Sequence, residues 1–374
     1  MKSAKSKKQK KFSGTTILLN LILGANFASL ILLYVSGYNG LIYPGYYPLF
    51  TFISLAFPFF LIINLAFVFF WIVFHTSYIK YSVLGLLIAF YPIRTYIPFN
   101  FSSSRPEGCI KVVSYNCKSF AVPRSKDSVR FDNMLAYLSN LDADILCLQE
   151  GNYKTDNADG KAIEAALSSW QYIDTIHLEH LNGIVLCSKY PILEKKFIAC
   201  PSPSHGARLY KLKLPNDTIY LVNCHFVSNS LTPQDKEVYS RIIHNSDSAN
   251  MKDDTRYLAN KVDSAGVKRA IQADTLYKYL KEIQDKPLIV CGDFNDSPLA
   301  YPHYKLVRLL NDAYTSSGNG PGLSYNESKM FFRIDNILCS KHWKSYNSKV
   351  DKSISSSDHY PIQTYLKLDD KYTP

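Results

Sequence analysis

The chain has 374 residues and a formal net charge of +11, with 42 Lys and Arg residues against 31 Asp and Glu. The excess lies at the start: residues 1–96 hold eight basic residues and no acidic one, which leaves 34 basic against 31 acidic residues, or +3. This near balance argues against tight duplex binding by the larger part of the chain, and the eight cysteines, with no CxxC pair, exclude a zinc ribbon and a disulfide-dense scaffold.

Two apolar runs follow a Lys-rich tail, residues 1–15. The runs Thr16–Val35 and Leu49–Phe74 contain no charged residue, and each is long enough to span a bilayer. A signal peptide would end in a small-residue cleavage site followed by a polar region, and no such pattern follows the first run. We therefore expect a cytoplasmic tail and, over residues 16–98, a transmembrane module.

A third apolar segment, Tyr81–Ile93, lies between Lys80 and Arg94 and is shorter than the roughly 20 residues of a full span. If it lies at the interface, two spans keep the remaining chain in the cytoplasm. If its flanking basic side chains snorkel, three spans place the remaining chain outside. Residues 36–47 lack Lys and Arg and Lys80 suits an inner loop, whereas Arg94 favours the other arrangement. We expect three spans, in a multi-pass protein of the cell membrane whose larger domain faces the non-cytoplasmic side.

Beyond the module, apolar strands alternate with helical stretches. Strands are predicted near residues 110, 144, 184, 209, 220, 289, 336 and 363, and helices over stretches such as Val129–Asn140 and Ala270–Ile283. This alternation favours an α/β fold. Six cysteines in or beside the strands are typical of small buried packing residues: Cys117, Cys147, Cys187, Cys224, Cys291 and Cys339.

Polar side chains lie at the ends of several predicted strands, where α/β sheets place their chemistry. Asn116 and Glu150 each end a strand, and Asp293 and Asn295 follow the strand at Leu288–Cys291. Carboxylate and amide oxygens suit Mg²⁺ or Mn²⁺ better than zinc.

Two histidines accompany these residues. His225 closes one strand, His359 follows Asp358 in a turn, and Asp335 lies within an apolar run. Imidazoles here are free to transfer protons or to hold phosphate oxygens. Each position also has an ordinary explanation, namely a turn cap for Asp358, an ion pair with Arg333 for Asp335, and a satisfied core histidine for His225.

Taken in chain order, these motifs resemble the endonuclease/exonuclease/phosphatase superfamily, which includes DNase I-like nucleases, neutral sphingomyelinases and inositol-polyphosphate phosphatases. The resemblance covers residues 108–370 and implies a four-layer α/β sandwich, with two packed sheets, helices outside and the site at one end of the sheets. It rests on the Asn116 strand, Leu148-Gln149-Glu150, Ser188-Lys189-Tyr190-Pro191-Ile192, the His225 strand, Gly292-Asp293-Phe294-Asn295, Arg333-Ile334-Asp335 and Ser357-Asp358-His359.

The resemblance also implies a metal site. Glu150 would be the principal metal carboxylate, with Asn116 and Asp358 completing or supporting the shell. The ion, Mg²⁺ or alternatively Mn²⁺, would neutralise phosphate charge and stabilise the leaving oxyanion.

The catalytic roles follow from the same resemblance. Asp293 would orient and deprotonate the attacking water, and Asn295 would hold that water or a phosphate oxygen. His359, steered by Asp335, would contact the phosphate and move a proton, while His225 would donate to another phosphate oxygen.

Other polar features have ordinary interpretations. Arg269 and Gln272 are predicted to lie on a solvated helix face, and Arg208 to serve solubility on an edge strand. The polar stretch at residues 229–274 is either a rim beside the site or a solvated connection, and the Gly-rich stretch at residues 316–322 is a second candidate border.

We therefore expect a membrane-anchored, Mg²⁺-dependent phosphoric-ester hydrolase. Tethering favours the head groups of bilayer lipids as substrates, and no obligate protein partner is expected. Two alternatives remain: a tethered nuclease acting on DNA or RNA, and a membrane interaction module whose hydrolase site has decayed.

Overall fold

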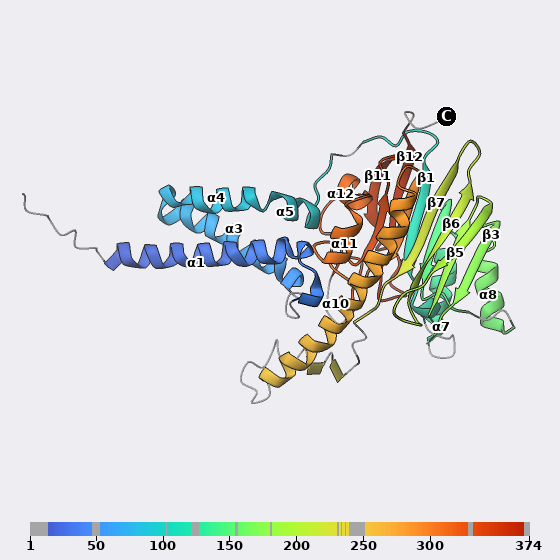
Figure 1. Ribbon diagram of the computed structural model, residues 1–374, viewed down its shortest axis with the longest axis horizontal. Coiled ribbons are helices and arrows are strands. Elements are labelled where there is room, and N and C mark those ends of the chain that lie inside the picture. The colour runs from blue at the N-terminus through green and yellow to red at the C-terminus, as the bar shows by residue number, and fades with distance from the viewer. Residues whose placement is uncertain are drawn as a thin grey trace, which may run out of the picture.

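The computed structural model describes residues 14–46, 53–101, 103–121, 127–153, 156–179, 182–229, 232, 234–235, 237–238, 251–327 and 332–369. A bundle of N-terminal helices projects from one side of an α/β domain (Figure 1). The predicted Lys-rich tail lies outside the described residues up to residue 13.

The domain contains two six-stranded sheets. One has the strand order β11-β12-β1-β2-β4-β3 and the other β5-β6-β7-β8-β10-β9. The strands are β1 (Ile110–Asn116), β2 (Ile145–Gln149), β3 (Tyr172–His177), β4 (Gly183–Ser188), β5 (Ile192–Ile198), β6 (Gly206–Lys213), β7 (Thr218–His225), β8 (Leu288–Asp293), β9 (Asn311–Asp312), β10 (Asp335–Cys339), β11 (Trp343–Val350) and β12 (Ile362–Leu368).

Helices cover the outer faces of both sheets. One apolar core lies between the sheets, and separate cores lie under the helices on each side. This arrangement confirms the predicted four-layer α/β sandwich. The helices whose bounds the structure describes are α6 (Lys118–Ala121), α7 (Ser128–Ser139), α8 (Ala158–Ala166), α10 (Met251–Glu282), α11 (Tyr301–Leu306) and α12 (Ala313–Ser317).

Local sequence explains where α7 begins and how it packs. Its N-cap, Asp127, accepts a hydrogen bond from the backbone amide of Arg130, which satisfies one of the free amides of the first turn. Phe131, Met134 and Leu138 recur at helical spacing and are all buried against the sheet.

The strand register gathers polar residues at one end of the sheets. In the second sheet Asp293 pairs with His225 of β7 on one side and with Asp335 of β10 on the other. In the first sheet Asn116 pairs with Gln149, and Glu150 follows directly. Residues far apart in sequence therefore meet because each ends or begins a strand at the same edge.

Gly292 lets β7 and β8 approach closely beside this edge. A Cβ atom at Gly292 would lie 1.9 Å from the carbonyl oxygen of Cys224, so only glycine fits there. The glycine that precedes Asp293 therefore has a packing role.

Among the described residues, the α-helices of the N-terminal module are α1 (Gly14–Gly37), α3 (Phe57–Phe74), α4 (Ile79–Ile88) and α5 (Phe90–Tyr96). In the part of the chain that the structure describes, two helices are long and apolar enough to cross a membrane, Gly14–Gly37 and Ser54–Phe74, and a third span results if the bent pair Thr76–Ile88 and Phe90–Tyr96, with an angle of 60°, counts as one. The surface of the bundle is also apolar, since Leu21, Ile62 and Leu87 are each more than 60% exposed. This exposure is typical of helices that face lipid.

A buried polar network holds the three long segments of the module together. Asn26 Oδ1 accepts hydrogen bonds from Ser82 Oγ at 2.6 Å and from Trp71 Nε1 at 3.0 Å, and Asn26 Nδ2 donates to Asn64 Oδ1 at 3.3 Å. Ser29 Oγ donates to Asn64 Oδ1 at 3.0 Å. Such interhelical hydrogen bonds favour one arrangement of helices within a bilayer.

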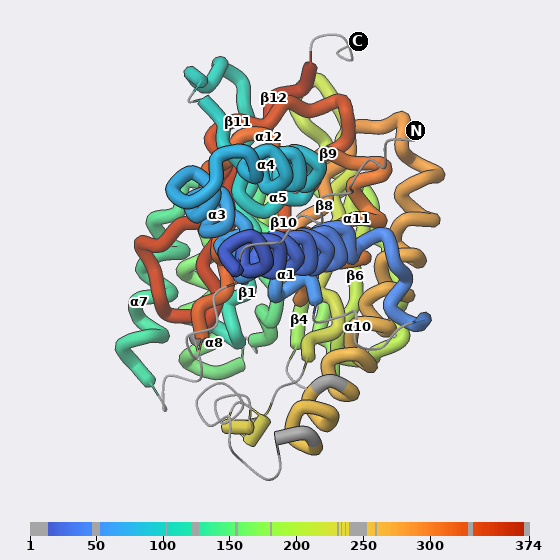
Figure 2. The backbone as a smooth tube through the Cα atoms, turned by 90° about the vertical axis from the view of Figure 1, so that its left-hand side faces the viewer, coloured from blue at the N-terminus to red at the C-terminus, as the bar shows by residue number. Residues whose placement is uncertain are grey.

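The helices alternate in direction between a far end and an end at the domain. At the far end Tyr78, just before α4, donates to Asn20 near the start of α1 and packs on Trp71 near the end of α3. At the near end the last residue of α1, Gly37, lies against Phe57 and Pro92. The chain thus approaches the domain along α1, leaves it along α3 and returns along α4 and α5 (Figure 1), and Figure 2 views these helices nearly end-on.

The near end of the module is joined to the domain by polar and apolar contacts. Leu299 of the domain belongs to the same apolar cluster as Phe57. Arg94 donates to the carbonyl of Thr315 at 2.8 Å and to Asn100 Oδ1 at 2.7 Å. Its guanidinium therefore links α5 to the domain. The Gly-rich stretch 316–322 contacts residues 98–100 here, and it does not line the pocket described below.

Candidate active site

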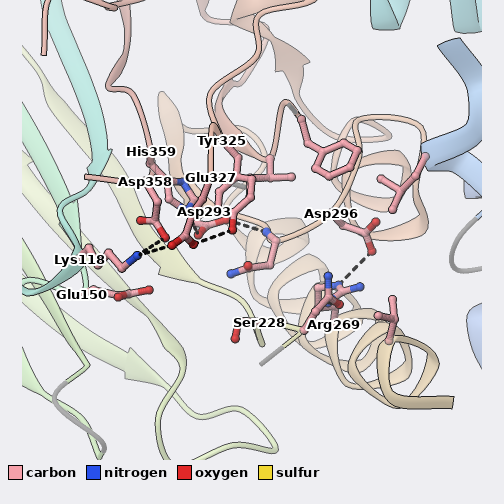
Figure 3. Close-up of a pocket in the computed structure, with 16 residues that line it drawn as sticks. Lys118, Glu150, Ser228, Arg269, Asp293, Asp296, Tyr325, Glu327, Asp358 and His359 are labelled. Atoms are coloured by element: carbon pink, nitrogen blue, oxygen red, sulfur yellow. Dashed lines mark hydrogen bonds and ion pairs between the residues drawn. The ribbon is translucent and has the colours of Figure 1, made fainter. Parts of the chain in front are cut away.

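A cavity of about 300 Å³ opens at the edge where the polar strand ends meet. Lys118, Glu150, Asp293, Asp358 and His359 gather on one side of it, and Arg269 with Asp296 lies on the other (Figure 3). Apolar residues complete the lining: Leu55, Val262, Phe332 and Ile334.

Asn116 holds two carboxylates together at the floor of the site. Its Nδ2 donates to Glu150 Oε1 and to Asp293 Oδ2, each at 3.0 Å, while its Oδ1 accepts from the backbone amide of Lys118 at 3.1 Å. Asp293 is fully buried, and its other oxygen accepts from the amide of Asn295 at 2.7 Å. The side chain of Asn295 donates to the carbonyl of Phe226 at 3.0 Å, which fixes the turn after β8.

His359 and Asp335 form a buried dyad. His359 Nδ1 lies 2.8 Å from Asp335 Oδ2, which leaves Nε2 directed toward Asp293 Oδ2 at 3.7 Å. Tyr325 packs edge-on against the imidazole, with ring centroids 5.1 Å apart. The dyad therefore fixes the ring orientation, and Asp335 does not pair with Arg333 in the structure.

His225 lies on the other side of Asp293. Its Nε2 is 3.8 Å from both Asp293 Oδ2 and Glu150 Oε1, beyond hydrogen-bond distance. The side chain is buried, and neither ring nitrogen has a hydrogen-bond partner among the described residues. A buried imidazole in this state is suited to a partner that arrives with the substrate.

The two histidines differ in protonation. Burial alone would lower the pKa of His359, but the carboxylates of Asp335 and Asp293 raise it to about 10. Burial, assisted by the positive charge of His359, lowers the pKa of His225 to about 3. At neutral pH His359 is thus a cation that can donate a proton, whereas His225 is neutral. Burial also raises the pKa of Asp293 above its ordinary value.

Lys118 adds a cation that the motifs did not identify. Its Nζ lies 2.7 Å from Asp358 Oδ2 and 3.5 Å from Glu327 Oε1. Lys118, Ser119 and Phe120 all have left-handed φ angles, of 45°, 53° and 56°. Each such residue costs of order 1 kcal/mol or more, and strain of this kind is typical of functional sites.

The residues fit a divalent cation. Carboxylates outnumber cations around the pocket, and Glu150 and Asp293 are held side by side by one amide and are not neutralised by a lysine or arginine among the described residues. Oxygen-rich sites of this kind attract hard cations such as Mg²⁺. Asp293, Asp335 and His359 also offer ligand atoms within 4.8 Å of one another, but His359 Nδ1 is already hydrogen-bonded to Asp335.

The solvated helix face predicted for Arg269 and Gln272 is wrong. Each is 1% exposed. Arg269 Nε donates to Asp296 Oδ2 at 3.0 Å, and Gln272 Oε1 accepts from the amide of Val227 at 2.8 Å. Together they hold the end of β7 and the turn after β8 against α10, so this part of stretch 229–274 forms a wall of the pocket.

Arg208 also has a structural partner. Its Nε lies 3.2 Å from Asp174 Oδ2, and its side chain is 14% exposed. It does not line the pocket, so the structure gives Arg208 a pairing role between the two sheets, in place of the predicted solubility role.

Sequence reasoning missed Lys118, Tyr325, Glu327 and Leu55 as lining residues. Lys118 stands two residues after Asn116, so the motif itself could have drawn attention to it. The others carry no local signal, because Tyr325 and Glu327 lie in an irregular segment and Leu55 belongs to the N-terminal module.

Comparison with known proteins agrees with the fold. The model of the Endonuclease/Exonuclease/phosphatase family matches residues 113–359, and that of a domain of unknown function (DUF8431) matches residues 19–96. No curated protein sequence matches the chain. The human nocturnin catalytic domain is 19% identical with a TM-score of 0.50, covering 71% of this chain and 100% of that one. TDP2 from C. elegans is 16% identical with a TM-score of 0.50, covering 71% and 76%. At these identities the likeness shows the fold alone.

Proposed function

The chain belongs to the endonuclease/exonuclease/phosphatase family of metal-dependent phosphoric-ester hydrolases, and on this premise we propose that it acts with Mg²⁺ on the head groups of membrane lipids. The observation that carries the catalytic proposal is the position of Asp293. It lies between His225 and the His359–Asp335 dyad, with Glu150 held beside it by Asn116.

Asp293 is the base in this proposal. It is buried, its pKa is raised, and the amide of Asn295 fixes one of its oxygens. A carboxylate of raised basicity can orient a water molecule and accept its proton during attack on phosphorus. Asn295 lines the same cavity and shapes the turn that positions Asp293.

In this proposal the two histidines contact the phosphate group of the ester. His359, held by Asp335, carries a proton on Nε2 at neutral pH and can donate it to a phosphate oxygen. Neutral His225 has no hydrogen-bond partner among the described residues and can donate to a second oxygen. Both therefore favour the greater negative charge of the transition state.

Glu150, Asn116 and Asp358 would hold the metal ion, which neutralises phosphate charge and stabilises the leaving oxygen. Glu150 lines the cavity, and its side chain is 28% exposed. Asn116 orients Glu150, and Asp358 contributes charge next to Lys118.

We also propose that three spans place the catalytic domain on the non-cytoplasmic side. The odd number of passes, α1, α3 and the α4–α5 pair, separates the N-terminus from the domain. Lys80 lies at the far end, where α1 begins at Gly14, and the Lys-rich tail precedes Gly14 in the sequence, so both suit the cytoplasmic side. Arg94 would by its charge alone favour the opposite arrangement. Its guanidinium instead donates hydrogen bonds to Thr315 and Asn100, so its position is explained by these contacts.

The test is Mg²⁺-dependent hydrolysis by the full chain in lipid nanodiscs, measured on DNA, RNA, sphingomyelin, glycerophospholipids and inositol phosphates. Asp293→Asn, which keeps shape and removes the base, is the matched control. Cleavage of a lipid by the wild type alone supports the proposal, and preferred cleavage of nucleic acid would replace it with a tethered nuclease. A folded protein inert on every substrate would indicate an interaction module.

A further inference from the structure

The active-site pocket has one wall supplied by the N-terminal module. Leu55 lies in a short 3-10 helix, Ser54–Ala56, that leads directly into the apolar helix α3. It lines the same cavity as Asp293 and His359. The domain therefore does not form the pocket alone.

Leu55 is held in this wall by the packing of its neighbours. Phe57 is fully buried in a cluster with Leu33 of α1, Tyr96 of α5 and Leu299 of the domain. Ser54 on the other side is also fully buried. Since both flanking segments are fixed, the half-buried side chain of Leu55 has a defined place beside the cavity.

The wall continues with apolar residues of the domain. Val262 of α10 and Ile334, next to the catalytic Asp335, are largely buried, and Phe332 is half-buried. With Leu55 they supply the apolar part of the lining of the cavity that also contains Asp293 and His359.

Cations on this side of the pocket are already paired. Arg269 lies 3.0 Å from Asp296 and is 1% exposed, so its charge is neutralised inside the protein. A polyanionic strand is bound by rows of available Lys and Arg side chains. The apolar wall lacks such a row among the described residues and is better suited to hydrocarbon.

Position along the bundle agrees with this chemistry. Leu55 precedes α3 at the end of the bundle that meets the domain, and the apolar sequence of α3 begins directly after it. The cavity wall at Leu55 therefore continues along the chain into a helix apolar enough to cross a membrane.

We infer that Leu55 is a specificity-determining residue: it contacts the hydrocarbon part of a membrane-resident phosphoester whose phosphate lies at Asp293 and His359. The inference rests on the proposed function and adds to it the part of the molecule that recognises the lipid. Apolar contact of one leucine side chain is expected to change relative affinity at least about fivefold.

The experiment measures inhibition of the activity found in the substrate panel by two monoesters, methyl phosphate and hexadecyl phosphate, with the full chain in nanodiscs. The quantity of interest is the ratio of the two inhibition constants. In Leu55→Asn, which keeps the approximate size, the preference for hexadecyl phosphate should fall at least about fivefold relative to wild type. Val262→Thr places a hydroxyl on the domain's part of the same wall, so it should also lower the preference for hexadecyl phosphate.

Leu193→Asn is the matched control. Leu193 is 50% exposed on the edge strand β5, away from the pocket, and its variant should keep the wild-type ratio. Thermal unfolding confirms that each variant is folded. An unchanged ratio in both wall variants would overturn the inference while leaving the proposed function intact. Absence of activity in the panel would instead remove the proposed function and the inference with it.

Discussion

The guanidinium of Arg333 donates a hydrogen bond to the backbone carbonyl of Thr95, in the last turn of α5. Arg333 is 1% exposed and lies 3.7 Å from Asp312. Asp335, which orients His359, follows two residues later in the chain. A buried charge thus joins the N-terminal module to the segment that carries the catalytic dyad.

Arg333→Met should destabilise the protein strongly. The substitution keeps much of the side chain volume but leaves Asp312 in a buried site without its arginine, a loss that typically costs about 3–5 kcal/mol. The midpoint of thermal unfolding in detergent measures the effect. Lys344→Met is the control: its pair with Asp369 at 3.2 Å is 60% exposed on the lysine side, and such pairs contribute at most about 1 kcal/mol. Equal shifts in the two variants would contradict this account.

The same pair predicts a pH dependence. Burial alone would raise the pKa of Asp312, but the Arg333 charge and hydrogen bonds from His303 and Thr315 hold it well below its ordinary value. A lowered carboxyl pKa stabilises the folded state above about pH 4, and this stabilisation is lost as the pH falls further.

Asp312→Asn should therefore unfold at a lower temperature than wild type at pH 7, and the difference should shrink as the pH is taken below about 4. Unfolding midpoints of both proteins between pH 3 and pH 7 measure it. A difference independent of pH across this range would show that the charge of Asp312 does not contribute.

Glu150→Gln should lower both metal affinity and turnover. Its carboxylate is the principal proposed metal ligand, so we expect the Mg²⁺ concentration for half-maximal activity to rise more than tenfold and EDTA to abolish wild-type activity until Mg²⁺ or Mn²⁺ is added. Calorimetric titration with Mn²⁺ reports binding without turnover. Glu327→Gln is the control, because Glu327 lines the same cavity and contacts Lys118. A larger loss of Mn²⁺ affinity in Glu327→Gln than in Glu150→Gln would assign the metal ion to Glu327 in place of Glu150.

Asp335→Asn should reduce kcat by about 10²- to 10⁴-fold, the usual contribution of positioned acid–base groups. The amide cannot hold imidazolium as the carboxylate does, so the pKa of His359 should fall as well. NMR titration of the His359 ring checks that shift. An unchanged ring titration would mean that Asp335 does not set the charge of His359.

The proposed orientation predicts opposite protection of the two termini. Protease added to intact cells that express a doubly tagged chain should remove a C-terminal tag and spare an N-terminal one. Loss of the C-terminal tag only after lysis would place the domain in the cytoplasm.

Central strands of the fold could be predicted from sequence, whereas edge strands could not. All eight predicted strands exist, and the four that were missed, β3, β5, β9 and β11, are the outermost strands of the two sheets. An edge strand is covered on fewer sides, so it lacks a continuous apolar run. The residues Leu193 to Phe197 of β5 are all exposed, three of them charged.

The candidate site residues at strand ends could be identified from sequence in the same way, because polar residues that follow apolar runs mark the ends of strands. Arg269 was misread because a charge on a helix is usually solvated, and its partner Asp296 lies 27 residues away. Leu55 and the contact between Arg333 and Thr95, 238 residues apart, depend on docking of the N-terminal module and have no local pattern.

Asn26 has a consequence for how the protein is made. Its side-chain amide in α1 is hydrogen-bonded to Asn64, Trp71 and Ser82, and Ser82 lies 56 residues further along the chain. While the chain is being synthesised, the Asn26 amide would sit in hydrocarbon without these partners until α3 brings Asn64 and Trp71, and its last partner, Ser82, arrives with α4. With the three spans proposed above, the N-terminal module would reach its final form only once Ser82 has entered the bilayer, shortly before the first strand of the catalytic domain emerges.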